Sequence, residues 1–427
     1  MMKKLIAVLA VLAMTAATAL AQASVAGTVE TRFSVLRGNL SDGDDDLYMG
    51  GFAGGAGAGS IGAAWLQLSG TNADGTLGGL FRFRNTDTVR GDAGWFHRVF
   101  VWWRPIDQMR IWLGVDQDGM FDTSHFAGWG FHQGDNDYMF NHHWDFWRRI
   151  FPGNWDGFGM ALSFSNFGVD GLALNLILPT GARNWPQATS AQVTRPLSVQ
   201  QMLAGFRLHG TYAIPGAGTL QFTYNAPGGI MNIDASMPGP SGTALNQYNP
   251  EWGDATNLGQ LGLSFLLTAL DFGNVLFGGA VIMPDSDHYL DAHFGAALDV
   301  PAATLGDVMG LRFRAGMHVQ GGDATADPFL AANVMPIVAL GPGALMFDVG
   351  LSMRFSDDFD SETDLGWSVK PVYRLPLSQG AFSIGLHIHS GLHERAGAAR
   401  GALDGNQGLS NNSDILIHIP MLLRFSF

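Results

Sequence analysis

The chain has 427 residues and a formal net charge of −14, and only 14% of its residues are charged, against roughly 25% in an ordinary soluble domain. It contains 12 Trp, 29 Phe and no Cys, and 47% of its residues are hydrophobic. These values exclude an intrinsically disordered chain, a disulfide scaffold and a cysteine-based metal or redox site, and the negative charge argues against nucleic-acid binding.

The first 23 residues have the pattern of a secretory signal peptide. Lys3 and Lys4 precede an apolar stretch, and residues 21–23 supply the small side chains that a signal peptidase requires. A membrane anchor is the weaker interpretation, because the apolar stretch is short and no stop-transfer pattern follows it. We therefore expect residues 1–23 to be a signal peptide and residues 24–427 to form one exported domain.

After residue 23 the sequence alternates between apolar and polar side chains in segments of about ten residues, which Gly, Asn, Asp and Pro interrupt. No later stretch approaches the ~20 apolar residues of a transmembrane helix. The alternation predicts eighteen strands, with sixteen as the alternative count. They cover residues 26–36, 59–69, 77–86, 96–104, 108–116, 158–166, 171–179, 200–214, 219–226, 257–270, 274–283, 288–299, 308–320, 329–340, 344–354, 365–376, 381–391 and 414–427.

The connections between these strands are sorted by length. Those after even-numbered strands are short, such as RPID, NFGVD and GPG. Those after odd-numbered strands include the longest, namely 37–58, 117–157, 180–199, 227–256 and 392–413. Long loops at one end and short turns at the other are typical of an all-β fold, the transmembrane antiparallel up-and-down β-barrel. Pro420 and two further prolines inside strands argue against regular pairing, and we interpret them as bulges or positions near the rim.

The connection 117–157 follows the fifth predicted strand and is too aromatic for a loop exposed to water. Its aromatic residues have helical spacing over 139–150, and we expect the segment to pack against the barrel wall. Its neighbouring histidines point in different directions on either a strand or a helix, so they predict no metal site. The side chains expected to act here are Asp118, Asp122, Trp129, Asp135, Asp137, His142, Trp144, Trp147, Arg148 and Arg149.

The last strand has an uninterrupted apolar face. Every second residue from Ile415 to Phe427 is apolar, which suits a strand whose outer face contacts lipid. With the signal peptide, the alternating strands, the sorted loops and the terminal Phe427, the chain resembles the porin superfamily of diderm outer membranes. Eighteen strands are more similar to its substrate-selective members than to its sixteen-strand general diffusion porins.

This resemblance has several implications. The segment 117–157 would be the loop that folds inward after the fifth strand and narrows the channel. Phe425 and Phe427 would belong to the C-terminal signal that the barrel-assembly machinery reads. The protein would lie in the cell outer membrane, in contact with its lipid, and could assemble as a homotrimer.

In such a barrel the face opposite the lipid lines the channel. In this sequence that face collects basic side chains, whereas the acids lie mostly in loops, such as Asp42 and Asp44. The expected pore-lining residues are Arg32, Arg82, Arg84, Arg110, Arg207, Arg312, Arg314, Arg354, Lys370, Arg374 and Arg424. A basic wall would attract anions, although large barrels also use Arg simply to keep the lumen polar. His387 and His389 share this face and are expected to be solvated polar residues.

The sequence contains no catalytic motif and requires no cofactor or metal. A barrel enzyme would need Ser, His and an orienting polar residue on the outer face, where the predicted residues are almost all apolar. We therefore predict a passive channel for small hydrophilic solutes, biased toward anions or particular substrates, and no enzyme. The alternatives are a transporter of hydrophobic compounds that uses 117–157 as a binding element, and a surface-exposed adhesin or structural barrel.

Overall fold

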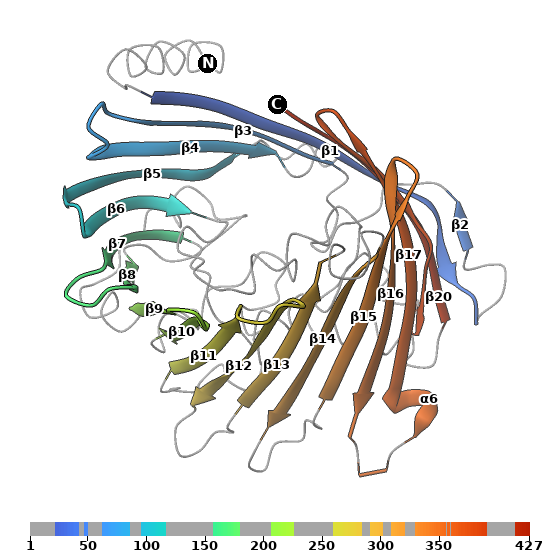
Figure 1. The fold of residues 1–427 in the computed structure, drawn as a ribbon. Helices are drawn as coiled ribbons and strands as arrows, with labels where there is room; N and C mark the ends of the chain where they lie inside the picture. Colours follow the sequence, from blue (N-terminus) through green and yellow to red (C-terminus); the bar gives the residue numbers. More distant parts are fainter. Residues whose placement is uncertain are drawn as a thin grey trace, which may run out of the picture.

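The alternating segments form strands that join edge to edge into one antiparallel barrel (Figure 1). The computed structural model describes residues 22–41, 47–49, 62–85, 95–116, 157–179, 206–225, 259–283, 291–301, 309–320, 329–355, 357–358, 360–390 and 415–427. Within these ranges there is one helix, α6 (Ser361–Asp364), and no helix there is long and apolar enough to cross a membrane.

The first half of the strands comprises β1 (Gln22–Asn39), β2 (Leu47–Met49), β3 (Gly62–Thr71), β4 (Leu77–Asn85), β5 (Trp95–Ile106), β6 (Met109–Asp116), β7 (Gly157–Ser165), β8 (Leu172–Pro179), β9 (Arg207–Ile214) and β10 (Gly218–Asn225). The second half comprises β11 (Gly259–Leu267), β12 (Asn274–Met283), β13 (Asp291–Val300), β14 (Met309–Gln320), β15 (Phe329–Leu340), β16 (Gly343–Arg354), β17 (Leu365–Leu377), β18 (Gly380–Gly385), β19 (His387–Ser390) and β20 (Ile415–Ser426).

The barrel closes because β1 pairs with β3 along one edge and with β20 along the other. β18 and β19 are two segments of one barrel strand on either side of Leu386, since both pair with β17 and with β20. β2 lies outside the main ladder and pairs only with the far end of β1 among the described residues. The described part of the chain therefore forms eighteen barrel strands, which confirms the predicted fold and count rather than the alternative of sixteen. The sequence analysis missed β2.

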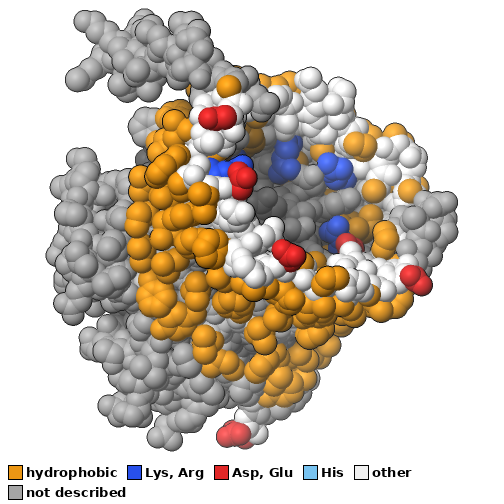
Figure 2. Space-filling view, turned by 60° about the vertical axis from the view of Figure 1, so that its left-hand side comes forward, with side chains coloured by type: hydrophobic (Ala, Val, Ile, Leu, Met, Phe, Trp, Pro, Cys, Tyr) orange, Lys and Arg blue, Asp and Glu red, His pale blue; other side chains and the backbone are white. Residues whose placement is uncertain are grey.

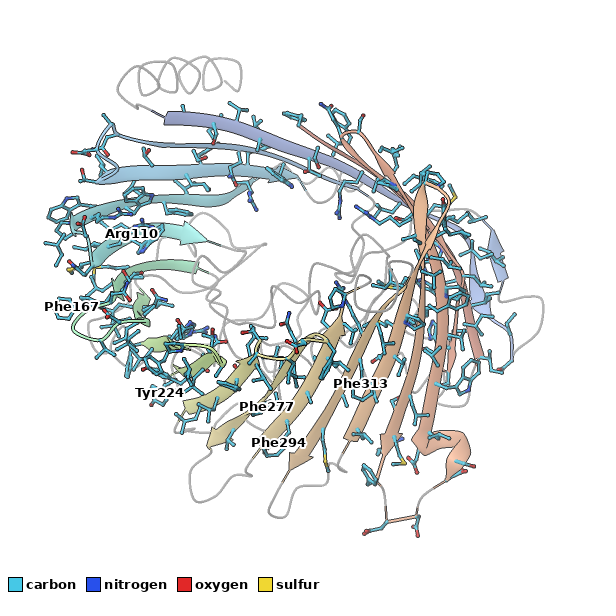
Figure 3. The ribbon with its side chains drawn as sticks, in the orientation of Figure 1. Arg110, Phe167, Tyr224, Phe277, Phe294 and Phe313 are labelled. Atoms are coloured by element: carbon cyan, nitrogen blue, oxygen red, sulfur yellow. The ribbon has the colours of Figure 1, made fainter. Side chains whose placement is uncertain are left out.

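The two faces of the wall carry different side chains, as the alternation requires. On β16 the outward side chains Phe347, Val349 and Leu351 are 38–48% exposed, whereas the inward side chains Asp348 and Ser352 are buried. Phe277, Phe294 and Phe313 continue the exposed apolar surface across β12, β13 and β14 (Figure 3). Hydrophobic side chains cover much of the outer wall in the view of Figure 2.

Short turns join alternate pairs of strands at one end of the barrel. The turn 72–76 between β3 and β4 is held by Asn72, whose side-chain oxygen accepts a hydrogen bond from the backbone N–H of Leu77 at 2.9 Å. Gly75 in this turn has a φ of 68°, a conformation that a residue with a side chain rarely adopts. The predicted inward loop 117–157 and its helix over 139–150 lie outside the described residues.

The closing seam between β1 and β20 explains two features of the sequence. A register shift lies between Ser34 and Leu36, opposite Pro420, so a bulge rather than a rim position accounts for this proline. Pro371, another of the strand prolines, pairs with Phe347 without a register shift. At the end of the seam, Phe427 and Gly27 exchange two backbone hydrogen bonds of 2.9 and 3.0 Å. The ring of Phe427 covers Gly27, where a methyl group would overlap it.

Candidate functional site

The candidate site is the inward face of the barrel wall. The structure describes the side chains of eight of the expected pore-lining residues: Arg82, Arg110, Arg207, Arg312, Arg354, Lys370, Arg374 and Arg424. Each alternates along its strand with outward side chains. Arg32, Arg84 and Arg314 are placed by backbone register alone. Figure 2 shows Lys and Arg side chains at several points around a hollow, with Asp or Glu side chains close to some of them.

On β3 and β4, Arg82 is held between a polar and an aromatic neighbour. Its Nε and Nη2 atoms donate hydrogen bonds to the Oε1 atom of Gln67 at 2.9 and 2.6 Å. Its guanidinium carbon lies 4.6 Å from the ring centroid of Trp65. Gln67 and Arg82 are register partners, so the β3–β4 pairing itself brings the two side chains together.

On β5 and β6, Arg110 lies over two indole rings. Its guanidinium carbon is 4.4 Å from the centroid of Trp102 and 5.0 Å from that of Trp112. A cation in this position is attracted by the negative face of each ring, by about 0.5–1 kcal/mol per contact at an exposed site and more when it is desolvated. We call Trp65, Arg82, Trp102, Arg110 and Trp112 the arginine–tryptophan wall.

Cross-strand packing fixes the two indoles of β5 and β6. Trp102 and Trp112 are register partners with ring centroids 6.2 Å apart. The Nε1 atom of Trp112 donates a hydrogen bond of 2.9 Å to the hydroxyl of Ser163 on β7, and Phe100 packs edge-on against Trp112 at 5.4 Å. Trp102 lies over Gly78 on β4, and a methyl group there would overlap the indole. The arginine therefore lies against a rigid aromatic surface.

Two inward arginines, on β14 and β16, lie against carboxylates instead. The Nε atom of Arg312 lies 3.2 Å from Oδ1 of Asp299, its register partner on β13. The Nε atom of Arg354 lies 2.8 Å from Oδ1 of Asp364, at the end of α6. We call Asp299, Arg312, Arg354 and Asp364 the paired wall.

Next to the paired wall lies a buried polar layer. Asp348 and Lys370 are register partners on β16 and β17, with 0% and 5% exposure. The side-chain Nδ2 of Asn333 donates a hydrogen bond of 3.1 Å to Oδ1 of Asp348. Buried carboxylates and ammonium groups persist only when other polar groups stabilise them, so this layer is a structural part of the wall.

The histidines of the wall differ from the expectation. His387 and His389 were expected to be solvated, but they are 5% and 8% exposed. His387 packs edge-on against His418, its register partner on β20, with ring centroids 5.7 Å apart. Alternation places a side chain on the inward face but does not reveal what covers it there. Among the described residues, no group of three or more His, Cys, Asp or Glu is arranged to hold a metal ion.

The inward face also carries an apolar patch. Met335, Met346, Val372 and Leu422 form one buried cluster across β15, β16, β17 and β20. The sequence analysis did not single out these residues, although their alternation with exposed neighbours such as Val334 and Leu423 could have placed them inward. The lumen wall is therefore not uniformly polar in its described part.

The other predicted residues lie on further strands of the wall, at the end of β20, or outside the described part of the chain. Arg207 is 8% exposed on β9, and Arg424 on β20 is the register partner of Glu30 across the seam. The expected assembly residues Phe425 and Phe427 lie exposed on the outer face at the end of β20, with ring centroids 6.2 Å apart. The expected constriction residues of 117–157 lie outside the described part of the chain.

Comparison with known proteins finds likeness in shape alone. No family model matches the chain, and neither does any curated protein. Among solved structures, an anion-selective porin from Comamonas acidovorans has a TM-score of 0.49 at 13% identity, with 95% of this chain and 100% of that chain covered. A triple mutant of the Rhodopseudomonas blastica porin has a TM-score of 0.41 at 12% identity, with the same shares covered.

Proposed function

We propose that the chain is a porin of a bacterial outer membrane, a passive diffusion channel for small hydrophilic solutes that favours anions. The observation that carries the proposal is the sorting of side chains across a closed wall. Exposed apolar residues cover the outside, whereas arginines, a lysine and other polar residues lie inside. A closed barrel satisfies every backbone polar group without an edge, which is the condition for a β-structure to lie in lipid.

The apolar exterior supports a membrane location. Val99, Val101 and Trp103 on β5 are 40–54% exposed, as are Leu261 and Leu263 on β11 at 46% and 58%. A water-soluble monomer rarely exposes a contiguous apolar surface of this extent. The signal peptide expected at residues 1–23 would supply export, and assembly as a trimer remains part of the proposal.

The arginine–tryptophan wall supports the bias toward anions. Arg110 contacts the indole rings of Trp102 and Trp112, which stabilise its positive charge without neutralising it. Fixed charges on a narrow wall with a low-dielectric surround raise the local concentration of the opposite ion. The proposal involves no chemical reaction and no cofactor.

Outer-membrane fractionation and planar-bilayer recording test this function. We expect the protein to fractionate with the outer membrane, to change its gel mobility on heating and to produce stable conductance steps. Recovery of a folded protein from the soluble periplasmic fraction would contradict the membrane location. A heat-modifiable barrel that gives no conductance would contradict the channel function and favour a structural barrel or an adhesin.

A further inference from the structure

We propose that the inward face of β5 and β6 around Arg110 is a binding subsite for aromatic carboxylates. Such a solute is a planar organic anion that carries both a ring and a carboxylate. The inference deepens the proposed channel function and rests on it, since the subsite lies on the wall that solutes would pass. Figure 3 labels Arg110 on β6.

The first argument is the position of the Arg110 guanidinium. Its central carbon lies over two indole rings, 4.4 Å from the centroid of Trp102 and 5.0 Å from that of Trp112. The N–H groups of a guanidinium point outward in its plane, in a fork that matches a carboxylate. Contact with two indole rings restricts the movement of this fork before a ligand arrives, which lowers the entropic cost of binding.

The second argument is the absence of an acid at this arginine. Among the described residues no carboxylate pairs with Arg110, whereas Arg312 and Arg354 lie 3.2 and 2.8 Å from Asp299 and Asp364. An arginine that already has a carboxylate partner must exchange it for a ligand, but Arg110 need not. The charge of Arg110 is therefore available to a solute carboxylate.

The third argument concerns the rest of the ligand. Phe100, Trp102 and Trp112 surround Arg110 with half-buried aromatic surface, and Phe100 contacts Trp112 edge-on. A ligand ring adjacent to the carboxylate would add to this cluster by edge contacts. A sugar would instead need an open indole face to stack on, and the guanidinium lies over a face of both indoles. The cluster thus favours an aromatic acid over a neutral sugar.

Benzoate is the simplest probe of this subsite. The purified protein, folded in detergent, is titrated with benzoate in a calorimeter, and benzoate is also added to single channels in a bilayer. Acetate provides the charge without the ring, and benzyl alcohol provides the ring without the charge. We expect benzoate to bind at least about tenfold more tightly than either control compound and to interrupt the channel current.

Three substitutions locate the binding. Arg110→Lys retains the charge but loses the planar fork, and Trp102→Leu removes one of the rings that hold it. Each should weaken benzoate binding by about tenfold. Trp103→Leu is the matched control, because Trp103 is the next residue on β5 and is 52% exposed on the outer face. It should leave benzoate binding unchanged, and heat-modifiable gel mobility verifies that every variant is folded.

The possible results distinguish failure of the proposed subsite from failure of the proposed channel function. Wild-type channels that conduct but bind benzoate no better than acetate would overturn the subsite and leave the channel function intact. Equal benzoate affinity in wild type and in folded Arg110→Lys would also overturn it. Calorimetric binding that depends on Arg110 and Trp102, in a protein that does not conduct, would support the subsite while contradicting the channel.

Discussion

The arginine–tryptophan wall on β3–β6 and the paired wall on β13–β17 belong to the same closed sheet, and both present arginines on its inward face. On the first wall Arg82 and Arg110 lie over indoles at 4.6 and 4.4 Å. On the second, Arg312 and Arg354 lie against carboxylates. Inward-facing arginines therefore add positive potential to the lumen on the first wall, whereas on the second wall they form neutral pairs with carboxylates.

The difference shows why a count of basic residues does not give the charge of a lumen. An indole stabilises a guanidinium without cancelling its charge, whereas a carboxylate at contact distance cancels most of it. Arg312 was expected to be one of the residues that attract anions, but its pairing with Asp299 makes it the weaker candidate. We therefore assign the anion preference to the arginine–tryptophan wall.

The largest expected effect follows from weakening the closing seam between β1 and β20, because both walls depend on a closed barrel. Deletion of Phe427 removes its two backbone hydrogen bonds to Gly27, each of which contributes about 0.5–1.5 kcal/mol. The fraction of heat-modifiable barrel on gels should fall, while export stays normal. Phe427→Tyr, which keeps the ring and the backbone bonds, is the control. Wild-type levels of assembled barrel after the deletion would show that this seam contact is dispensable.

The second-largest expected effect is on ion selectivity, and it distinguishes the charges of the two walls. In water, a fixed unit charge interacts with an ion ~10 Å away by about 0.4 kcal/mol, and 0.1 M salt reduces this interaction energy to roughly a third. Arg82→Gln with Arg110→Gln should therefore lower the anion-to-cation permeability ratio about threefold at 0.1 M salt, and less at 1 M. The matched control is Arg312→Gln with Asp299→Asn, which removes a neutral pair. Equal shifts in reversal potential for the two double variants would contradict the comparison.

A smaller effect of the opposite sign should follow when the paired wall loses an acid. Asp299→Asn leaves Arg312 without the carboxylate that lies 3.2 Å from its Nε atom. The paired wall then gains a positive charge, and the permeability ratio should shift toward anions by less than about twofold. Reversal potentials in a KCl gradient measure this shift. An unchanged ratio would mean that the Asp299–Arg312 pair does not face the ion path.

The smallest effect concerns the turn that joins β3 to β4, outside the lumen. The Oδ1 atom of Asp74 accepts hydrogen bonds from the Thr76 hydroxyl at 2.6 Å and from its backbone N–H at 3.0 Å. These bonds, the hydroxyl first, lower the pKa of Asp74 below its ordinary value. A carboxyl whose pKa is lowered by folding stabilises the fold above its unfolded pKa, and this contribution is lost as the pH falls through the folded pKa.

Thr76→Val should therefore make the barrel slightly less stable at neutral pH, and the difference should shrink as the pH falls below the ordinary Asp pKa. Thermal unfolding in detergent at several pH values measures it. Ion selectivity should not change, because the turn contributes no side chain to either wall. A stability difference that is the same at all pH values would show that the hydroxyl acts through packing rather than through the carboxylate.

The sequence predicted the strands well because one physical pattern determines them. Alternation between apolar and polar side chains is strict on β14, and on β20 the outward face is apolar throughout; the predicted ranges match both strands within a residue or two. The bulge opposite Pro420 is one of the two explanations that the missing backbone donor of proline suggested, the other being a position near the rim. β2 escaped prediction because its three residues are too few to alternate.

The partners of the inward residues could not be predicted in the same way. Alternation shows that Arg110 faces inward, but the two indoles beneath it depend on the register of β5 against β6. The pairing of Arg312 with Asp299 is easier to predict from the sequence, since the two residues lie on consecutive strands joined by a short connection. His387 packs edge-on against His418, which lies on a strand reached only after a long connection.

The zero-current potential of the wild-type channel in a gradient of KCl at about 0.1 M tests the central claim most directly, because screening is then modest. If the arginine–tryptophan wall sets the field of the lumen, the potential lies nearer the equilibrium potential of chloride than that of potassium. A potential near that of potassium would show that acids dominate the ion path and that the arginine–tryptophan wall does not govern permeation.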